Sequence, residues 1–243
     1  MGPKRSLGRR VGMLLGGLQK NSLIDYPGKV SCVVFLSGCN FHCPYCHNPD
    51  LVKDNLRPSL LDAKLLYGLL EGRKRFLDGV VISGGEPTLQ QDLICLCKEI
   101  KKMGYSIKLD TNGSRPQVIK RLIDERLVDY IAMDIKTDPF HYPPSITTNC
   151  NPHAIISTIQ ILMESIVAYE FRTTCVKPFV DLKVIEKIAK SIKGATLYVL
   201  QHFRNDRILH PEFFHKTEVA YTEDELIRLK SIAEQWVKKC ILR

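Results

Sequence analysis

The sequence contains no long hydrophobic run, no low-complexity tract and no linker rich in glycine, serine and proline. A helix that crosses a membrane needs about 18 or more apolar residues in a row, so none is predicted here. Because no linker divides the 243 residues, we expect one domain over residues 31–243, preceded by a partly irregular extension over residues 1–30. A hydrophobic fraction of 44% and a charged fraction of 25% are typical of a globular protein.

The features of a secreted protein are also missing. The N-terminus has a basic head and a short apolar run over residues 11–18, but Gly12, Gly16 and Gly17 interrupt this run. No small-x-small cleavage site follows it. Nine cysteines are an odd number, and most are not spaced as a disulfide framework. We therefore expect a reduced, cytoplasmic protein.

The net charge of +9 is spread along the chain and is densest at residues 4–10 and 73–75. This charge fits a solvated basic surface, and it also fits a docking face for an acidic protein or a nucleic acid. Aromatic residues do not alternate with the basic ones as they do in proteins that bind single strands. The charge alone therefore does not indicate nucleic-acid binding.

Short runs of strand character alternate with longer helical patterns from residue 30 onward. The expected strands are residues 32–36, 79–83, 106–110, 130–134, 170–174 and 196–200. The expected helices are residues 60–71, 91–103, 116–126, 152–165, 180–192 and 222–239. The last helix begins with a capping box, Thr222-Glu-Asp-Glu225. Nearly continuous apolar strands that alternate with helices predict a parallel α/β sheet.

Six strand–helix units favour an open, partial (β/α)6 barrel of the TIM type, because eight units usually need about 250 residues. A doubly wound sheet shows the same alternation and stays an alternative. Both folds build their active sites at the carboxyl ends of the strands. Polar clusters follow five expected strands there, at residues 39–47, 83–87, 110–113, 134–136 and 172–174. Residues 138–152 are rich in proline and are expected to be irregular.

The cluster after the first strand contains Cys39, Cys43 and Cys46 in the spacing C-x3-C-x2-C, with His47 directly after. A c-type haem fits the Cys43-Pro-Tyr-Cys46-His47 run, but it would leave Cys39 unused and would require export. A zinc ion could take the three cysteines and His47, although Cys46 and His47 are too close in sequence for usual zinc ligands. An iron–sulfur cubane could take the three thiolates and leave one iron open to a small chelating ligand.

The cysteine motif, with Tyr45 before its last cysteine, resembles the signature of the radical S-adenosylmethionine (SAM) superfamily. Gly-Gly-Glu-Pro at residues 84–87 resembles the second motif of that superfamily, and the six-unit partial barrel is its shared core. Within it, residues 25–28, 46–49, 110–113 and 134–136 resemble the glycyl-radical-enzyme activating proteins. Residues 16–28 look most like one type of anaerobic ribonucleoside-triphosphate reductase activating protein.

This resemblance implies that Cys39, Cys43 and Cys46 hold a [4Fe–4S] cluster whose open iron is chelated by SAM. It also implies a set of cofactor-binding residues: Tyr45, Cys46, His47, Gly84, Gly85, Glu86, Asp110, Asp134, Lys136, Arg172 and His202. Tyr45 would lie near the adenine, and residues 84–86 would line the methionine end. In some relatives, positions that match Asp110 and Asp134 bind a monovalent cation.

The implied reaction is the reductive cleavage of SAM to methionine and a 5′-deoxyadenosyl radical, with electrons from a low-potential donor such as flavodoxin or ferredoxin. The radical would abstract hydrogen from a backbone glycine of a partner, here anaerobic ribonucleotide reductase. One alternative is a radical SAM enzyme that acts on a small molecule or an RNA nucleoside, as a deazapurine synthase does. Another is a zinc-stabilised binding module without turnover.

Overall fold

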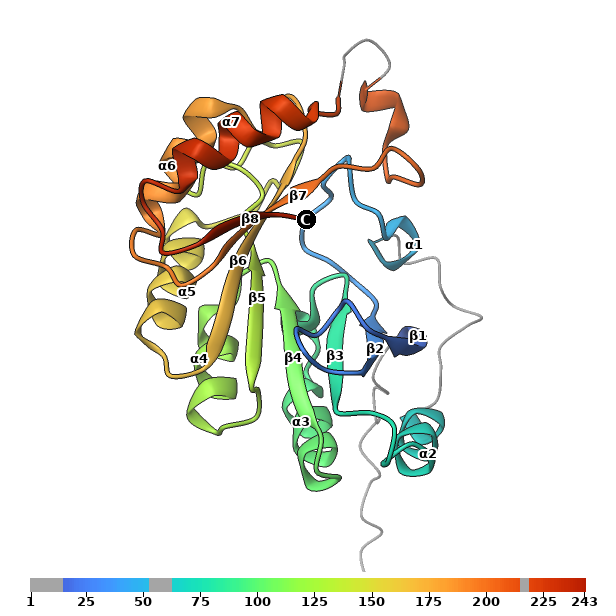
Figure 1. Cartoon of the computed structure of the whole chain (residues 1–243). Helices are drawn as coiled ribbons and strands as arrows, with labels where there is room; N and C mark the ends of the chain where they lie inside the picture. Colours follow the sequence, from blue (N-terminus) through green and yellow to red (C-terminus); the bar gives the residue numbers. More distant parts are fainter. Residues whose placement is uncertain (1–14, 53–62, 215–218) are drawn as a thin grey trace, which may run out of the picture.

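The computed structural model describes residues 15–52, 63–214 and 219–243, and its centre is one eight-stranded sheet (Figure 1). The strands lie in chain order from β1 to β8. All neighbouring pairs from β2 to β8 are parallel, and β1 is antiparallel to β2. The strands are β1 (Leu15–Ser22), β2 (Ser31–Leu36), β3 (Gly79–Gly84), β4 (Ser106–Thr111), β5 (Tyr130–Asp134), β6 (Ala168–Cys175), β7 (Tyr198–His202) and β8 (Cys240–Leu242).

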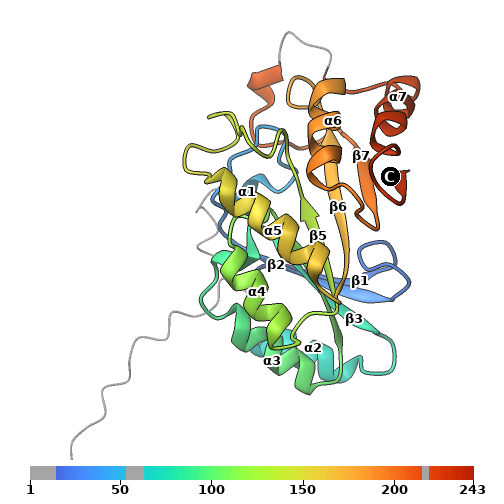
Figure 2. The ribbon, with the colours of Figure 1, turned by 90° about the vertical axis from the view of Figure 1, so that its left-hand side faces the viewer.

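Helices follow the parallel strands and cover the outer face of the sheet. Figure 2 shows α3, α4, α5 and α6 side by side across this face. The helices are α1 (Pro49–Val52), α2 (Ala63–Gly72), α3 (Leu93–Lys102), α4 (Pro116–Asp124), α5 (Pro152–Glu164), α6 (Leu182–Ser191) and α7 (Glu223–Ala233), with the short 3-10 helices η1 (Pro87–Leu89) and η2 (Pro211–Phe214).

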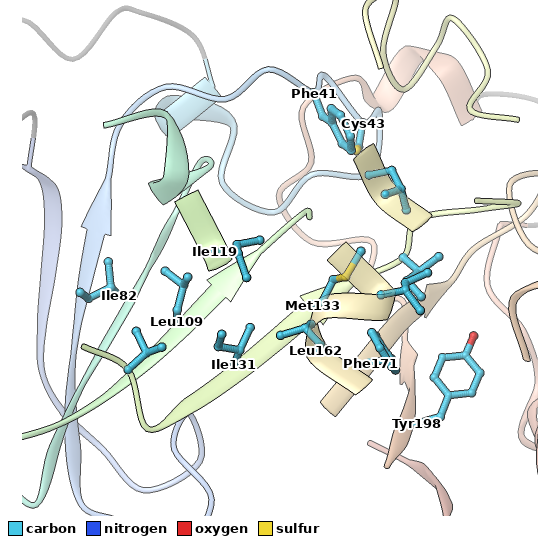
Figure 3. Packing of buried hydrophobic residues seen from close by; sticks show 14 of the residues in the cluster. Phe41, Cys43, Ile82, Leu109, Ile119, Ile131, Met133, Leu162, Phe171 and Tyr198 are labelled. Carbon is cyan, nitrogen blue, oxygen red and sulfur yellow. The ribbon is translucent and has the colours of Figure 1, made fainter. Parts of the chain in front are cut away.

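The two faces of the sheet differ in chemistry because side chains alternate along a strand. The outer-facing side chains pack against helices to form the main core (Figure 3), and they include Leu109, Met133 and Phe171, all fully buried. Burying each of these side chains stabilises the fold by roughly 1.5–3 kcal/mol. Lys108 on β4 and Glu170 on β6 directly precede Leu109 and Phe171, so they point to the inner face, and both are buried and charged. The outer face is therefore apolar, whereas the inner face combines these charged residues with a small apolar cluster of Tyr26, Val33 and Val81.

The structure confirms the expected parallel α/β fold. Each of the six expected strands overlaps one of β2 to β7, and the expected helices match α2 to α7 within a few residues at most ends. A doubly wound sheet reverses its strand order at a switch point, whereas here the order is continuous. The architecture is a curved, open sheet of the partial-barrel kind. Residues 138–152 form neither helix nor strand before the start of α5 at Pro152, as expected.

Two strands lie outside the six that the sequence predicts. Strand β1 occupies part of the extension expected to be irregular, and β8 adds the edge strand beside β7. The last helix was expected to reach residue 239 but ends at Ala233, because residues 234–239 turn the chain back toward the sheet. The basic residues 4–10 lie outside the described residues. No helix in the described part of the chain is long and apolar enough to cross a membrane.

Candidate functional site

A cavity of about 430 Å³ lies at the carboxyl ends of the parallel strands, inside the curved sheet. It brings together residues from all five of the polar clusters that the sequence places there. The predicted residues that line it are Cys39, Cys43, Tyr45, Cys46, His47, Gly84, Gly85, Asp110, Asp134, Lys136, Arg172 and His202. One predicted residue, Glu86, is not among the residues that line the cavity.

The cysteine loop is held in place from both sides. The backbone N–H of Gly38 donates to the carbonyl of Leu51 at 2.7 Å, and the N–H of Cys46 donates to the carbonyl of Cys43 at 3.0 Å. On the other side, the N–H of His42 donates to the carbonyl of Ile146 at 2.8 Å. The irregular segment 138–152 therefore fastens the loop that carries the three thiols.

Gly84 and Gly85 press the end of β3 against the start of this loop. A Cβ atom at Gly84 would lie 2.3 Å from the carbonyl oxygen of Leu36, and one at Gly85 would lie 2.1 Å from that of Gly38. Gly84 also has a φ of +123°, a backbone conformation that residues other than glycine rarely adopt. Only glycine at both positions allows the backbone to approach the cysteine loop this closely.

Glu86 lies next to the two glycines, and its side chain is not among those that line the cavity. Its side chain is 1% exposed. Its carboxylate accepts hydrogen bonds from the Thr111 hydroxyl at 2.8 Å, the Asn112 N–H at 2.6 Å and the Thr88 N–H at 3.1 Å. Burial raises the pKa of Glu86, and these donors oppose that rise. The carboxylate thus joins the end of β3 to the end of β4.

The three thiols have an environment that suits metal-bound thiolates. Burial raises the pKa of Cys39 and of Cys43 to about 12 and also raises the pKa of Cys46. The nearby ammonium of Lys136 opposes this rise in all three pKa values but does not outweigh it. The N–H of Phe41 lies 3.4 Å from the sulfur of Cys39. A metal cluster supplies the positive charge that deprotonation of such buried thiols requires. The residues therefore fit an iron–sulfur cluster.

A closed zinc site does not fit the same residues. Within the described ranges, no three histidine, cysteine, aspartate or glutamate side chains are arranged to hold a single metal ion. The ring of His47 packs against Phe203, with 5.8 Å between ring centroids. A cubane differs from zinc because it spreads its cysteine ligands over separate iron atoms. The contact of His47 with Phe203 therefore argues against a closed zinc site made of His47 and the three cysteines.

A buried ion-pair network forms the floor of the cavity. Arg172 donates from Nε to Oδ1 of Asp134 at 2.7 Å, and Lys136 donates from Nζ to Oδ2 at 3.0 Å. Burial alone would raise the pKa of Asp134, but the charges of Arg172 and Lys136 outweigh it and hold that pKa well below its usual range. Burial alone would lower the pKa of Lys136, but Asp134 and Cys43 raise it instead. All three groups are therefore charged at neutral pH.

Asp110 lies in the same network, next to Asp134. It accepts a hydrogen bond from the Ser83 hydroxyl at 3.0 Å, and its other oxygen pairs with the Lys108 ammonium. The guanidinium of Arg172 lies 3.4 Å from that second oxygen. Arg172 thus bridges the two carboxylates that the sequence predicts in this site.

The remaining predicted residues surround the cavity above this floor. Tyr45 is 3% exposed, and its hydroxyl donates to the backbone carbonyl of Lys136 at 3.3 Å. Its ring packs against Phe179, with 5.3 Å between centroids. His202 also lines the cavity but is exposed, which places it at the rim.

Three contributions were missed by the sequence analysis. Asn40, inside the cysteine motif, accepts from the side chain of Asn112 at 2.9 Å and so ties the loop to the end of β4. Asp25, from a motif that carried the family resemblance, lines the cavity from the β1–β2 loop. Lys108 lies beneath Asp110, and its position two residues before that aspartate on a strand was a signal available in the sequence.

Three comparisons place the chain among known proteins. The family model described as "Radical SAM superfamily" matches residues 33–192. A Methanocaldococcus jannaschii protein named "Putative glycyl-radical enzyme activating enzyme" is 35% identical over 235 residues, which are 95% of this chain and 95% of that protein. A "Pyruvate formate-lyase-activating enzyme" of Clostridium pasteurianum is 34% identical over 123 residues, or 49% of this chain and 50% of that protein.

Among solved structures, SuiB of Streptococcus suis bound to S-adenosylmethionine superposes with a TM-score of 0.64. The match covers 84% of this chain and 48% of that chain, with 15% identical residues. At this level of identity the likeness concerns the fold alone. It agrees with the open, mostly parallel sheet described above.

Proposed function

The chain belongs to the radical SAM superfamily and to its glycyl-radical enzyme activating enzymes, and we propose that it generates a glycyl radical on a partner enzyme. The observation that carries this proposal is the shared cavity. Three thiols, of which that of Cys43 is buried, two glycines that admit no side chain and a charged floor all face one space of about 430 Å³. No acid–base pair is required, since the bound cofactors carry the difficult chemistry.

Cys39, Cys43 and Cys46 would hold a [4Fe–4S] cluster, and the rest of the cavity would hold SAM. When bound and reduced, these cofactors supply a carbon-centred radical that can abstract a hydrogen atom. The residues of this chain would bind these cofactors, orient them and exclude water from the cavity. Lys136 and Arg172 offer positive charge to an anionic ligand group, and Tyr45 gives the cavity an aromatic wall.

The backbone around Gly84 and Gly85 is a second candidate for contact with SAM. Because both residues lack a side chain, the main chain itself forms this part of the cavity wall. We place the methionine end of SAM here, where backbone carbonyls can accept hydrogen bonds from its ammonium group. His47 and His202 are proposed as further contacts from the cavity rim.

For the partner, we propose anaerobic ribonucleoside-triphosphate reductase. The support is the resemblance of residues 16–28, which include most of β1 and the start of the β1–β2 loop. This loop also brings Asp25 to the cavity. The electron donor is proposed to be a low-potential protein such as flavodoxin or ferredoxin, and the setting a reduced cytoplasm. Neither a membrane nor a nucleic acid has a part in the proposal.

A monovalent cation is not included among the required cofactors. The resemblance implies one at Asp110 and Asp134, but both carboxylates already have cationic side chains of this chain beside them. The proposed cofactors are therefore the cluster and SAM.

An anaerobic assay tests the proposal in two steps. The protein is reconstituted with iron and sulfide, reduced with dithionite and given SAM, and 5′-deoxyadenosine is quantified beside a Cys43→Ala control. Product from the wild type and none from the variant is the expected result. Candidate partners, the anaerobic reductase first and pyruvate formate-lyase second, are then added and examined for a glycyl radical by electron paramagnetic resonance.

The two steps fail in different ways. A protein that binds zinc and yields no 5′-deoxyadenosine would overturn the enzymatic proposal. SAM cleavage without a radical on the reductase, but with one on pyruvate formate-lyase, would overturn only the proposed partner. Cleavage with a radical on neither would favour a small-molecule substrate.

A further inference from the structure

Lys108 is a buried charge that the proposed reaction does not use. It lies on β4 and is 1% exposed, although lysine is almost never fully buried unless it is paired. Its position two residues before Asp110 places both side chains on the inner face of the sheet. The Lys108 ammonium pairs with one oxygen of Asp110, and the two side chains are 2% and 16% exposed.

All four carboxylate oxygens of the two aspartates have a donor from this chain. In Asp110, Oδ1 faces the ammonium of Lys108, and Oδ2 accepts from the Ser83 hydroxyl at 3.0 Å. In Asp134, Oδ1 accepts from Arg172 at 2.7 Å, and Oδ2 accepts from Lys136 at 3.0 Å. A monovalent metal ion at either carboxylate would therefore lie beside a donor of this chain, and at three of the four oxygens that donor is a lysine or arginine.

The local charge also disfavours a further cation. Three cationic side chains, those of Lys108, Lys136 and Arg172, meet the two carboxylates. Like charges in a buried site repel strongly because the surrounding dielectric constant is low. The remaining positive charge favours an anionic group of a ligand, and the residues do not fit the metal cation that the family resemblance implies.

We propose that Lys108 is the built-in cation of this site. Its ammonium neutralises Asp110 and keeps the carboxylate in place, so the site needs neither Na⁺ nor K⁺. Lys108 is therefore a positioning residue, which acts on the ligand through Asp110. Only the activity test of this inference rests on the proposed function, since the melting-temperature test uses the protein without cofactors.

The first test uses thermal unfolding of the protein without cofactors. Melting temperatures are compared in KCl, NaCl and tetramethylammonium chloride at equal ionic strength, because tetramethylammonium is too large to coordinate carboxylates closely. The wild type is expected to show no difference between the three salts. Lys108→Met removes the ammonium and keeps an unbranched side chain, and its melting temperature should rise by about 2–4 °C in KCl or NaCl relative to tetramethylammonium.

Two further variants separate an ion site from a general loss of stability. Lys101→Met removes another lysine–aspartate pair, with Asp129 at 2.9 Å on the protein surface, and should show no difference between salts. Lys108→Met combined with Asp110→Asn removes both charges, and should also lose the response to K⁺ and Na⁺. A response that persists in this double variant would contradict the inference.

The second test measures 5′-deoxyadenosine formation in buffers free of Na⁺ and K⁺. The wild-type rate should stay within about twofold when KCl replaces tetramethylammonium chloride, and the Lys108→Met rate should rise at least tenfold. If K⁺ or Na⁺ raised either the reaction rate or the melting temperature of the wild type, the inference would be overturned. This result would hold even if the variant did not fold. Absence of product in every salt would instead overturn the proposed function, and the melting temperatures would still decide the role of Lys108.

Discussion

At the scale of single residues, the site depends on charges that are buried and matched. Asp134 is held between Arg172 at 2.7 Å and Lys136 at 3.0 Å, and none of the three is more than one-quarter exposed. Breaking a buried pair by removal of one partner leaves an uncompensated charge, which costs about 3–5 kcal/mol. The carboxylate is therefore as important for the stability of the cavity floor as for its chemistry.

Asp134 gives a prediction about pH. Because its folded pKa lies well below its unfolded value of about 3.9, its ionised form stabilises the protein above that value. This stabilisation is lost as the pH falls from about 4 toward the lower folded pKa. We expect Asp134→Asn to be less stable at pH 7 and to lose less of its remaining stability below pH 4. Urea unfolding of both proteins from pH 7 to pH 2.5 measures this, and parallel curves would contradict it.

Gly85 gives a prediction about close backbone approach. In Gly85→Ala the new methyl group would meet the carbonyl oxygen of Gly38 at 2.1 Å, so the cysteine loop must move. We expect a loss of about 2–4 kcal/mol in the free energy of unfolding, within the range of overpacked or strained sites, and loss of cluster binding. The control is Gly68→Ala in α2, where a Cβ meets nothing within 4 Å. The control should be stabilised by about 0.5–1 kcal/mol, because alanine favours a helix.

The sequence predicted the residues that line the cavity better than it predicted the direction of the Glu86 side chain. Cysteines, glycines and charged residues at the ends of strands were recognisable because parallel strands bring their carboxyl ends to one edge. Whether the carboxylate of Glu86 points into the cavity or away from it depends on its partners Thr111 and Asn112, which belong to the next strand unit. No local pattern encodes such a pairing.

At the scale of helices and strands, local signals predicted the elements that bury an apolar face. The six parallel strands were visible as short apolar runs between helical patterns. Their continuous order in the sheet was not, because a doubly wound sheet shows the same alternation. Strands β1 and β8 were not visible. The first contains two glycines in eight residues, and the second has only three residues. Both are edge strands, which exist because β2 and β7 offer them hydrogen-bonding partners.

The start of α7 gives a prediction at this scale. The Thr222 hydroxyl accepts from the N–H of Glu225, and the Glu225 carboxylate accepts from the N–H of Thr222 at 2.8 Å. We expect Thr222→Ala to lower the free energy of unfolding by about 1 kcal/mol, because the first turn loses its cap. Ser231→Ala, in the last turn of the same helix, should change stability by less than about 0.5 kcal/mol. Equal effects of the two substitutions in urea unfolding would show that the cap is unimportant.

At the scale of the whole molecule, the sheet is curved but remains open between its two edge strands. β1 and β8 occupy opposite ends of the strand order, and no pairing joins them in the described part of the chain. The ion-pair network of the cavity floor continues along the inside of the sheet toward β8. Arg172 lies 3.9 Å from Glu170, and Glu170 in turn pairs with Arg243, directly after β8.

This connection predicts that the end of the chain stabilises the inside of the sheet. Glu170 is fully buried and accepts from Arg243 through two contacts, at 3.2 and 3.3 Å, and from the Tyr130 hydroxyl at 3.1 Å. Arg243→Met removes both contacts from Arg243, but Glu170 keeps Tyr130 and the nearby Arg172. We therefore expect a loss of about 1–3 kcal/mol, below the full cost of an unpaired buried charge.

A double-mutant cycle with Glu170→Gln and Arg243→Met separates this pair from its surroundings. The two residues are in contact, so their effects on the free energy of unfolding should be non-additive, with a coupling of about 1–3 kcal/mol. High salt should weaken the coupling only modestly, because Glu170 is shielded from solvent even though Arg243 is 42% exposed. Additive effects would mean that β8 stabilises the sheet through its backbone pairing with β7 alone. A coupling would mean that the last strand also fixes the charges on which the cavity floor rests.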